Sequence, residues 1–163
     1  MLKKIVGTIL IGALGVGLYY GMAFSTPSSG QTAVGPEVRG TFDQLNVKKS
    51  GEARVTVRTK EDVDIVTSTG ILAVGGYTGW HSHPGPVFVV VKRGVLTVYN
   101  APTCQPQVYH AGEGFVEPSP EHVHTLRNEG AEEAEFTATF ILPVGVPRRT
   151  DEPQPIGGNC PIL

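Results

Sequence analysis

Short runs of apolar residues, either alternating or continuous, follow one another along most of the chain. Residues 53–59 and 63–67 alternate between apolar and polar positions, which is typical of a β-strand with one buried face. Residues 87–91 are continuously apolar, as expected for a strand that is buried on both faces. Further runs that predict strands lie at 71–74, 95–99, 107–109, 114–116, 122–127 and 135–142.

Glycine and proline separate these runs. The chain of 163 residues contains 21 glycines and 13 prolines, which favours short strands joined by tight turns over long helices. The sequence has no internal repeat and no heptad pattern. A chain of this length can bury a single core. We therefore expect one all-β domain, either a sandwich or a closed barrel.

The first 24 residues predict a signal peptide or a membrane anchor. Two lysines precede a run from Ile5 to Phe24 that carries no charge. As a hydrophobic helix, such a run is long enough to cross the core of a bilayer. The lysines favour a cytoplasmic N-terminus, so we expect the rest of the chain to be extracytoplasmic. Small residues at Ala23 and Ser25 fit a cleavage site, and the sequence leaves cleavage or anchoring open.

Composition divides the remaining chain into three parts. Residues 25–52 predict a flexible spacer, because their first part is rich in serine, threonine, proline and glycine. Residues 53–145 carry the predicted strands of the barrel, and residues 146–163 form a proline-rich C-terminal tail. In an oxidising compartment, Cys104 and Cys160 would join this tail to the barrel as a disulfide, with two free thiols as the alternative.

The charge pattern argues against a nucleic-acid partner. The formal net charge is −2, and the 13 lysines and arginines are spread along the chain without forming a basic stripe. We expect a small molecule as the partner instead, together with a membrane if the first segment stays attached.

Two histidine pairs carry the main chemical signal. His81 and His83 are separated by one residue, as are His122 and His124, and the chain has only five histidines. Residues i and i+2 of a strand share a face, so each pair can direct two imidazoles towards one point. Two such strands would offer up to four nitrogen ligands to a transition metal. The alternative is that the pairs are polar residues on a wet surface.

The spacing around these histidines resembles the two sequence motifs of the cupin superfamily. The residues that carry the resemblance are Gly75, His81, His83 and Gly94 in the first motif, and Gly112, Pro118, His124 and Asn128 in the second. The resemblance spans roughly 55–142 and is to small single-domain bacterial cupins of the conserved-barrel type. It implies an antiparallel jelly-roll barrel in which His81, His83 and His124 bind a divalent metal. Iron, manganese, nickel, copper and zinc all accept imidazole.

The expected carboxylate ligand is missing from the first motif. Cupins have a glutamate four or five residues after the second histidine, where this chain has Val87 and Phe88. Without it, the metal keeps its full charge and favours an anionic ligand. Three glutamates near the second motif are interpreted as solvated loop carboxylates, namely Glu113, Glu117 and Glu121.

The second motif departs in its register. Pro120 replaces a glycine, and one extra residue separates Pro118 from His124. We prefer His124 as the ligand, because its distance from Asn128 fits the motif. His122 is then a possible fourth or alternative ligand, or a hydrogen-bond donor to the ligands.

Cupins with three histidines and no carboxylate resemble thiol and diketone dioxygenases. The resemblance implies an exported or membrane-anchored metal-binding cupin, with oxidation of a small anionic molecule as a candidate activity. A non-catalytic cupin module that binds a metal or small ligand is the main alternative, and a purely structural domain is a third. Small cupins often pair through strand edges, so a homodimer is also a possible state.

Overall fold

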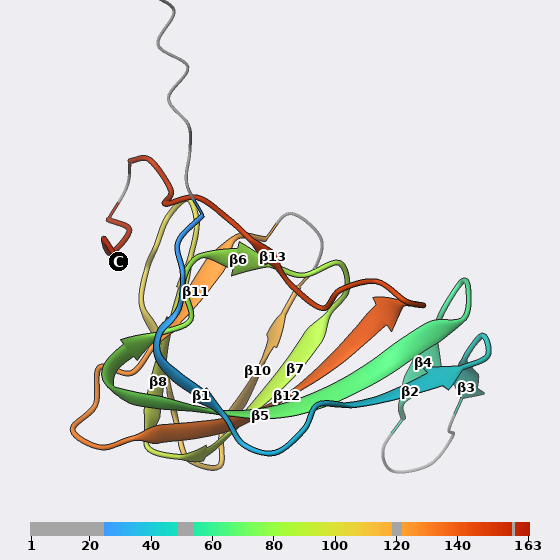
Figure 1. Cartoon of the computed structure of the whole chain (residues 1–163). Coiled ribbons are helices and arrows are strands. Elements are labelled where there is room, and N and C mark those ends of the chain that lie inside the picture. The colour runs from blue at the N-terminus through green and yellow to red at the C-terminus, as the bar shows by residue number, and fades with distance from the viewer. Residues whose placement is uncertain (1–24, 49–53, 119–121, 158) are drawn as a thin grey trace, which may run out of the picture.

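The computed structural model describes residues 25–48, 54–118, 122–157 and 159–163 (Figure 1). This part of the chain contains thirteen β-strands and no α-helix. The strands are β1 (Ser29–Ala33), β2 (Val38–Phe42), β3 (Asn46–Lys48), β4 (Thr56–Arg58), β5 (Val63–Tyr77), β6 (His81–Ser82), β7 (Val87–Arg93), β8 (Val95–Asn100), β9 (Gln107–His110), β10 (Gly114–Glu117), β11 (His124–Arg127), β12 (Ala134–Pro143) and β13 (Thr150–Asp151). All pairings are antiparallel, and eleven strands share one curved sheet. The predicted all-β, barrel-like architecture is confirmed.

The long strand β5 organises the sheet. It pairs with β12 along most of its length, and β12 pairs on its other side with β7. Buried and half-buried residues alternate along β12, so Phe136, Phe140 and Leu142 face the core. Outward threonines form cross-strand pairs, with Oγ1 of Thr69 3.2 Å from Oγ1 of Thr137. Burial of each large apolar side chain on the inward face of β12 stabilises the fold by about 1.5–3 kcal/mol.

The two strands predicted at 63–67 and 71–74 are one continuous strand. Gly70 lies within it, opposite Phe136 in the ladder. A Cβ atom at Gly70 would lie 2.9 Å from the Phe136 ring, so the glycine makes room for that aromatic core residue. β5 also extends beyond the end of the predicted run at 71–74, as far as Tyr77.

The predicted flexible spacer is wrong for residues 29–42. Strands β1 and β2 lie in this segment, and both pair with β5. Their side chains are exposed throughout. These strands are held by backbone hydrogen bonds rather than by apolar burial, so the hydropathy pattern carried no sign of them.

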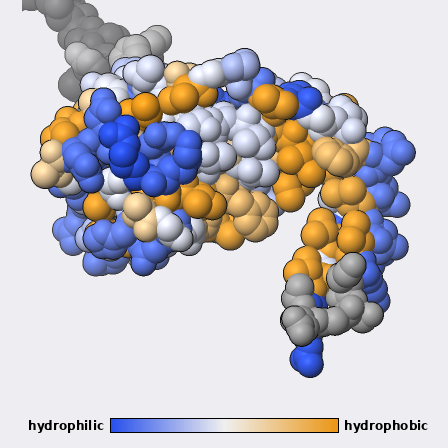
Figure 2. Space-filling view, turned by 90° about the horizontal axis from the view of Figure 1, so that it is seen from below, coloured by the Kyte–Doolittle hydropathy of each residue, from blue (hydrophilic) through white to orange (hydrophobic). Residues whose placement is uncertain are grey.

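A small two-stranded sheet of β3 and β4 extends the molecule beyond the barrel. Figure 2 shows this hairpin projecting as a separate arm with apolar side chains on its surface. Val47 and Val55 on this arm are about half exposed.

The tail beyond residue 146 packs against one end of the barrel. β13 pairs with β6, and the amide of Thr26 donates to the carbonyl of Glu152 at 3.1 Å. A disulfide joins Cys104 to Cys160, which fastens the tail to the loop after β8. This bond is the crosslinked alternative of the two that the sequence left open.

The predicted hydrophobic helix falls within residues 1–24, outside the described part, and stays a prediction. Among the residues that the structure describes, no helix has the length and apolar character needed to span a membrane.

Asp64 of β5 forms a buried polar anchor for the edge of the barrel. Its carboxylate accepts hydrogen bonds from Nη1 of Arg39 and Oγ1 of Thr41, both at 2.7 Å, and from the amide of Gly145 at 2.8 Å. The Gly145 amide, Thr41 and Arg39, in that order, lower the pKa of Asp64 from 3.8 to about 2. The ionised carboxylate therefore joins β2 to β5 and to the turn after β12.

We predict that Asp64→Asn destabilises the protein at neutral pH, because the amide loses charge-assisted bonds to Arg39 and Thr41. The native protein should lose stability as the pH falls from 3.8 towards 2, since only the unfolded chain readily protonates Asp64 there. Thermal unfolding at several pH values should show a melting temperature several degrees lower for the variant and a weaker acid dependence. The exposed residue Asp43, changed to Asn, is the matched control, and equal behaviour of the two variants would contradict the prediction.

Candidate metal centre

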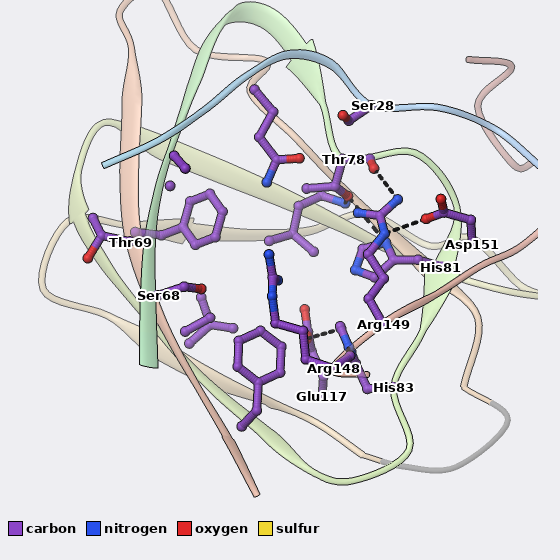
Figure 3. A pocket seen from close by; sticks show the side chains of 18 of the residues that line it. Ser28, Ser68, Thr69, Thr78, His81, His83, Glu117, Arg148, Arg149 and Asp151 are labelled. Atoms are coloured by element: carbon purple, nitrogen blue, oxygen red, sulfur yellow. Dashed lines mark hydrogen bonds and ion pairs between the residues drawn. The ribbon is translucent and has the colours of Figure 1, made fainter. Parts of the chain in front are cut away.

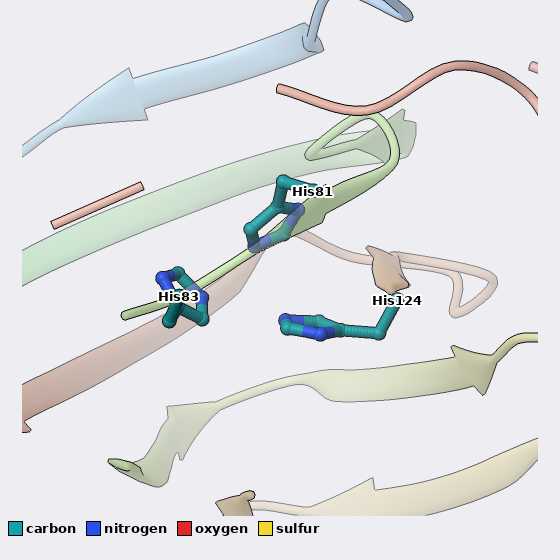
Figure 4. A group of neighbouring side chains, drawn as sticks. All are labelled: His81, His83 and His124. Atoms are coloured by element: carbon teal, nitrogen blue, oxygen red, sulfur yellow. The ribbon is translucent and has the colours of Figure 1, made fainter. Parts of the chain in front are cut away.

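Three buried histidines converge inside the barrel (Figure 4). One potential ligand atom from each of His81, His83 and His124 lies within 4.8 Å of the others. His81 and His124 are directly opposite in the pairing of β6 with β11, so their rings share a face, with centroids 4.3 Å apart. His83 follows His81 by two residues, and its ring centroid lies 4.8 Å from that of His81. The convergence expected from the two motifs is therefore present for these three residues.

Backbone carbonyls orient all three rings. Nδ1 of His81 lies 2.9 Å from the carbonyl oxygen of Gly79, and Nδ1 of His83 lies 2.6 Å from that of Arg148. Nδ1 of His124 lies 2.8 Å from the carbonyl oxygen of His122. A carbonyl can only accept, so each Nδ1 donates, and in the neutral ring Nε2 then keeps a lone pair. The carbonyls thus select the tautomer that presents Nε2 as a metal ligand.

The turn before His81 requires glycine. Gly79 has a φ of +74°, and a Cβ atom there would lie 2.1 Å from the carbonyl oxygen of Thr26. This left-handed turn directs the carbonyl of Gly79 towards the His81 ring. The requirement for glycine therefore contributes directly to the orientation of a candidate ligand.

Glu117 lies beside His83 and His124, and its interpretation as a solvated loop carboxylate is wrong. It is only 4% exposed. Its Oε2 lies 3.2 Å from Nε2 of His83, and its Oε1 lies 3.2 Å from Nε2 of His124. The residue ends β10, where its register partner on β7 is Val87. Val87 occupies a position where the cupin motif has its glutamate, so the carboxylate reaches the site from the neighbouring strand.

A sequence signal for Glu117 was available in the alternation of β10. Phe115 packs against the core, and a residue two positions later in a strand faces the same way. Alternation thus places the Glu117 side chain on the inward face, whereas its charge alone favours the solvated interpretation.

The contacts of Glu117 fit a bound cation. If the rings are neutral with the proton on Nδ1, Nε2 and the carboxylate oxygen are both acceptors and repel each other at 3.2 Å; a proton on Nε2 or a bound metal ion removes this repulsion. Nε2 of His124 is buried and makes no hydrogen bond. Three imidazole nitrogens and one carboxylate form a donor set that divalent transition metals accept.

The protonation states suit the same use. Burial, followed by repulsion from His124, Arg149 and His83, lowers the pKa of His81 well below its ordinary value. Burial opposes ionisation of Glu117, but the attraction of a positively charged His124 and the contacts with His83 outweigh burial and lower the pKa of the carboxyl. A neutral His81 and an ionised Glu117 are the forms that bind metals.

The ring of His122, expected as a possible fourth or alternative ligand, does not join the group. Its centroid lies 6.0 Å from that of His124, and it is the carbonyl of His122 that contacts the site. Among the described residues, Glu117 rather than His122 is the fourth potential donor beside His83 and His124.

A cavity of about 450 Å³ opens over His81, His83 and Glu117 (Figure 3). Apolar side chains such as Phe136 and Phe140 form part of its wall, and the tail contributes Arg148 and Arg149. The histidine end of the barrel is therefore accessible to a small molecule.

The side chain of Arg149 is occupied by contacts within the protein. Its Nη2 donates to the carbonyl of Thr78 at 2.7 Å, and its Nε pairs with the carboxylate of Asp151. These bonds hold residues 149–151 against the turn that precedes β6.

Comparison with known proteins agrees with this architecture. Residues 68–140 match the sequence profile of the cupin domain family. No curated protein matches the chain significantly.

Three of the solved structures that match parts of this chain are the following. A cupin-like protein from Thermotoga maritima is 21% identical and has a TM-score of 0.49, and the match covers 55% of this chain and 65% of that one. An uncharacterised protein with a double-stranded β-helix domain from Klebsiella pneumoniae is 18% identical, with a TM-score of 0.48 and coverage of 72% and 85%. An oxalate oxidase is 27% identical, with a TM-score of 0.43, over 49% of this chain and 46% of that one. The match thus spans about half the length of the oxalate oxidase.

We predict that the metal-free protein loses stability as the pH falls below 6.5, the ordinary pKa of histidine. His81 resists protonation only when folded, so the unfolded chain binds an extra proton in acid and is favoured. Chemical denaturation of chelator-treated protein between pH 7.5 and 5.5 (about one unit either side of the ordinary histidine pKa) should show a steeper loss for the native chain than for His81→Gln. The exposed His110, changed to Gln, should leave the slope unchanged. Identical slopes for the native chain and His81→Gln would refute this prediction.

Proposed function

This chain belongs to the cupin superfamily, and we propose that its barrel holds a divalent transition metal. Nε2 of His81, His83 and His124 and a carboxylate oxygen of Glu117 would be the ligands. The observation that carries this proposal is the buried carboxylate of Glu117, 3.2 Å from Nε2 of His83 and of His124, two rings whose Nδ1 atoms donate to backbone carbonyls. Only a cation, whether a metal ion or a proton, relieves that arrangement, and the buried three-histidine cluster favours the metal.

We propose metal-dependent oxidation of a small anionic molecule as the activity. A bound redox-active metal supplies the electron-transfer chemistry for oxidation by dioxygen. The protein's own residues fix the donor atoms through backbone carbonyls and keep the centre at the base of a cavity. Four protein donors leave coordination positions available on metals that prefer six ligands.

Glu117 changes the comparison with other cupins. The likeness to thiol and diketone dioxygenases depended on a ligand set without a carboxylate. An ionised Glu117 would lower the net charge of the centre from +2 to +1, so the substrate class is better argued from the cavity than from an uncompensated metal charge.

A non-catalytic binding module is the second candidate. His83 and His124 contact Glu117, and Nδ1 of His81 contacts the carbonyl of Gly79, so these groups are engaged within the protein rather than free to transfer a proton. This observation suits a cupin that binds a metal or small ligand without converting it.

We also propose that the protein acts outside the cytoplasm. The lysines and uncharged run of the first 24 residues support export, with or without cleavage. The Cys104–Cys160 disulfide supports the same proposal, since such bonds persist in oxidising compartments.

We predict that His83→Ala removes most of the bound metal, because it deletes one of only four donors. Glu117→Gln should weaken metal affinity by about tenfold or more, since an amide keeps the shape of the side chain and loses its charge. Elemental analysis and competition with a chelator measure both effects on the folded protein. Glu113→Gln, at an exposed position two residues before Phe115, is the control. Full metal occupancy in both test variants would mean that the ligands are wrongly assigned.

Oxygen uptake decides between the two candidate functions. We expect the iron-loaded protein to consume oxygen with at least one class among small thiols, diketones, phenols and carboxylates. His83→Ala should abolish that uptake. Metal binding without uptake in any class would favour the non-catalytic module.

A further inference from the structure

We infer that Arg148 forms a carboxylate-binding subsite in the cavity, and that the ligand of this centre is a small organic acid with an apolar body. The inference rests on the proposed function in one respect: the ligand contacts Arg148 at one end and the proposed metal at the other. The subsite itself is built from residues that lie outside the histidine and glutamate donor set.

Arg148 has a fixed position relative to the candidate metal ligands. Its carbonyl accepts the hydrogen bond from Nδ1 of His83 at 2.6 Å. Its guanidinium carbon lies 5.2 Å from the centre of the Phe140 ring, and the same ring lies 5.2 Å from the His83 ring. One residue therefore orients a ligand through its backbone and presents a cation to the cavity through its side chain. Figure 3 shows this side chain on the side of the cavity where Glu117 and His83 lie.

The guanidinium has donors available for a ligand. Its Nε pairs with Oε2 of Glu37 at 2.6 Å, and this contact leaves the two terminal nitrogens for other acceptors. The side chain is 39% exposed, although the residue lines the cavity. A planar guanidinium binds a carboxylate through two parallel hydrogen bonds, and its contact with Phe140 holds the plane in place.

Arg149 is less suited to this role. Both its Nε and its Nη2 are occupied within the protein, by Asp151 and by the carbonyl of Thr78. Arg148 is therefore the cation of the cavity that is available to an incoming anion.

The walls of the cavity define the rest of the ligand. Val89, Leu126, Phe136 and Phe140 line the same cavity as Arg148, His81 and His83 and provide its apolar surface. A cavity of about 450 Å³ accommodates a molecule with few heavy atoms. A short carboxylate that carries a second oxygen donor can contact Arg148 with one end, the metal with the other and the apolar wall between them. A 2-oxo or 2-hydroxy acid has this chemistry.

The test uses the full chain loaded with zinc, which binds without redox turnover, and isothermal titration calorimetry. The probes are 2-oxobutyrate, butyrate, the neutral analogue butyramide and inorganic phosphate. We expect 2-oxobutyrate to bind about tenfold or more tightly than butyramide, from the charge-assisted bonds to Arg148. Arg148→Gln should weaken 2-oxobutyrate binding by a similar factor, and Arg148→Lys should restore part of it because charge returns without the planar fork.

Glu37→Gln provides a test in the opposite direction. It removes the carboxylate that competes for the guanidinium, so 2-oxobutyrate should bind more tightly to this variant, which a loss of folding would not produce. Arg93→Gln removes the same charge from the outer surface, where Arg93 pairs with Glu133, and should leave binding unchanged.

The outcomes separate the subsite from the metal centre. Binding that is unaffected by Arg148→Gln, equal affinity for butyramide, or phosphate bound more tightly than either acid would overturn the inference. Zinc content is measured in every sample, and a low value in the native chain contradicts the metal centre instead. Butyrate binding to that metal-free protein then still tests Arg148, because this contact does not need the metal.

Discussion

Three backbone carbonyls, those of Gly79, His122 and Arg148, each face Nδ1 of a buried histidine. These hydrogen bonds are the constraint on which the rest of the site depends. They decide which nitrogen of each ring carries the proton, and so turn the lone pairs of Nε2 towards one point. Rings without such partners would be free to rotate or to present a proton, and their proximity alone would not make a metal site.

Pairing across strands explains how the site keeps a carboxylate that its first motif lacks. Glu117 and Val87 are register partners on β10 and β7, so their side chains leave the sheet at the same level and on the same face. A glutamate at either of these two positions can therefore place its carboxylate oxygens near the same histidines. In an antiparallel barrel, the donor set belongs to a level of the sheet rather than to a single stretch of sequence.

The sequence predicted those parts of the structure that depend on apolar alternation and on local spacing. The core strands, the barrel class and the convergence of His81, His83 and His124 all follow from side chains that alternate along a strand. Features that depend on partners distant in the chain were missed. β1 and β2 bury no apolar face, and Glu117 is recognisable as a buried group only once β10 is placed beside β7.

The tail gives the site a particular order of assembly. Residues 81–124 contain the three histidines and Glu117, but the carbonyl that orients His83 belongs to Arg148, 65 positions further along. During synthesis these groups therefore emerge before the carbonyl that orients His83. The orientation of the His83 ring therefore depends on the tail packing against the barrel, a position that the Cys104–Cys160 bond secures.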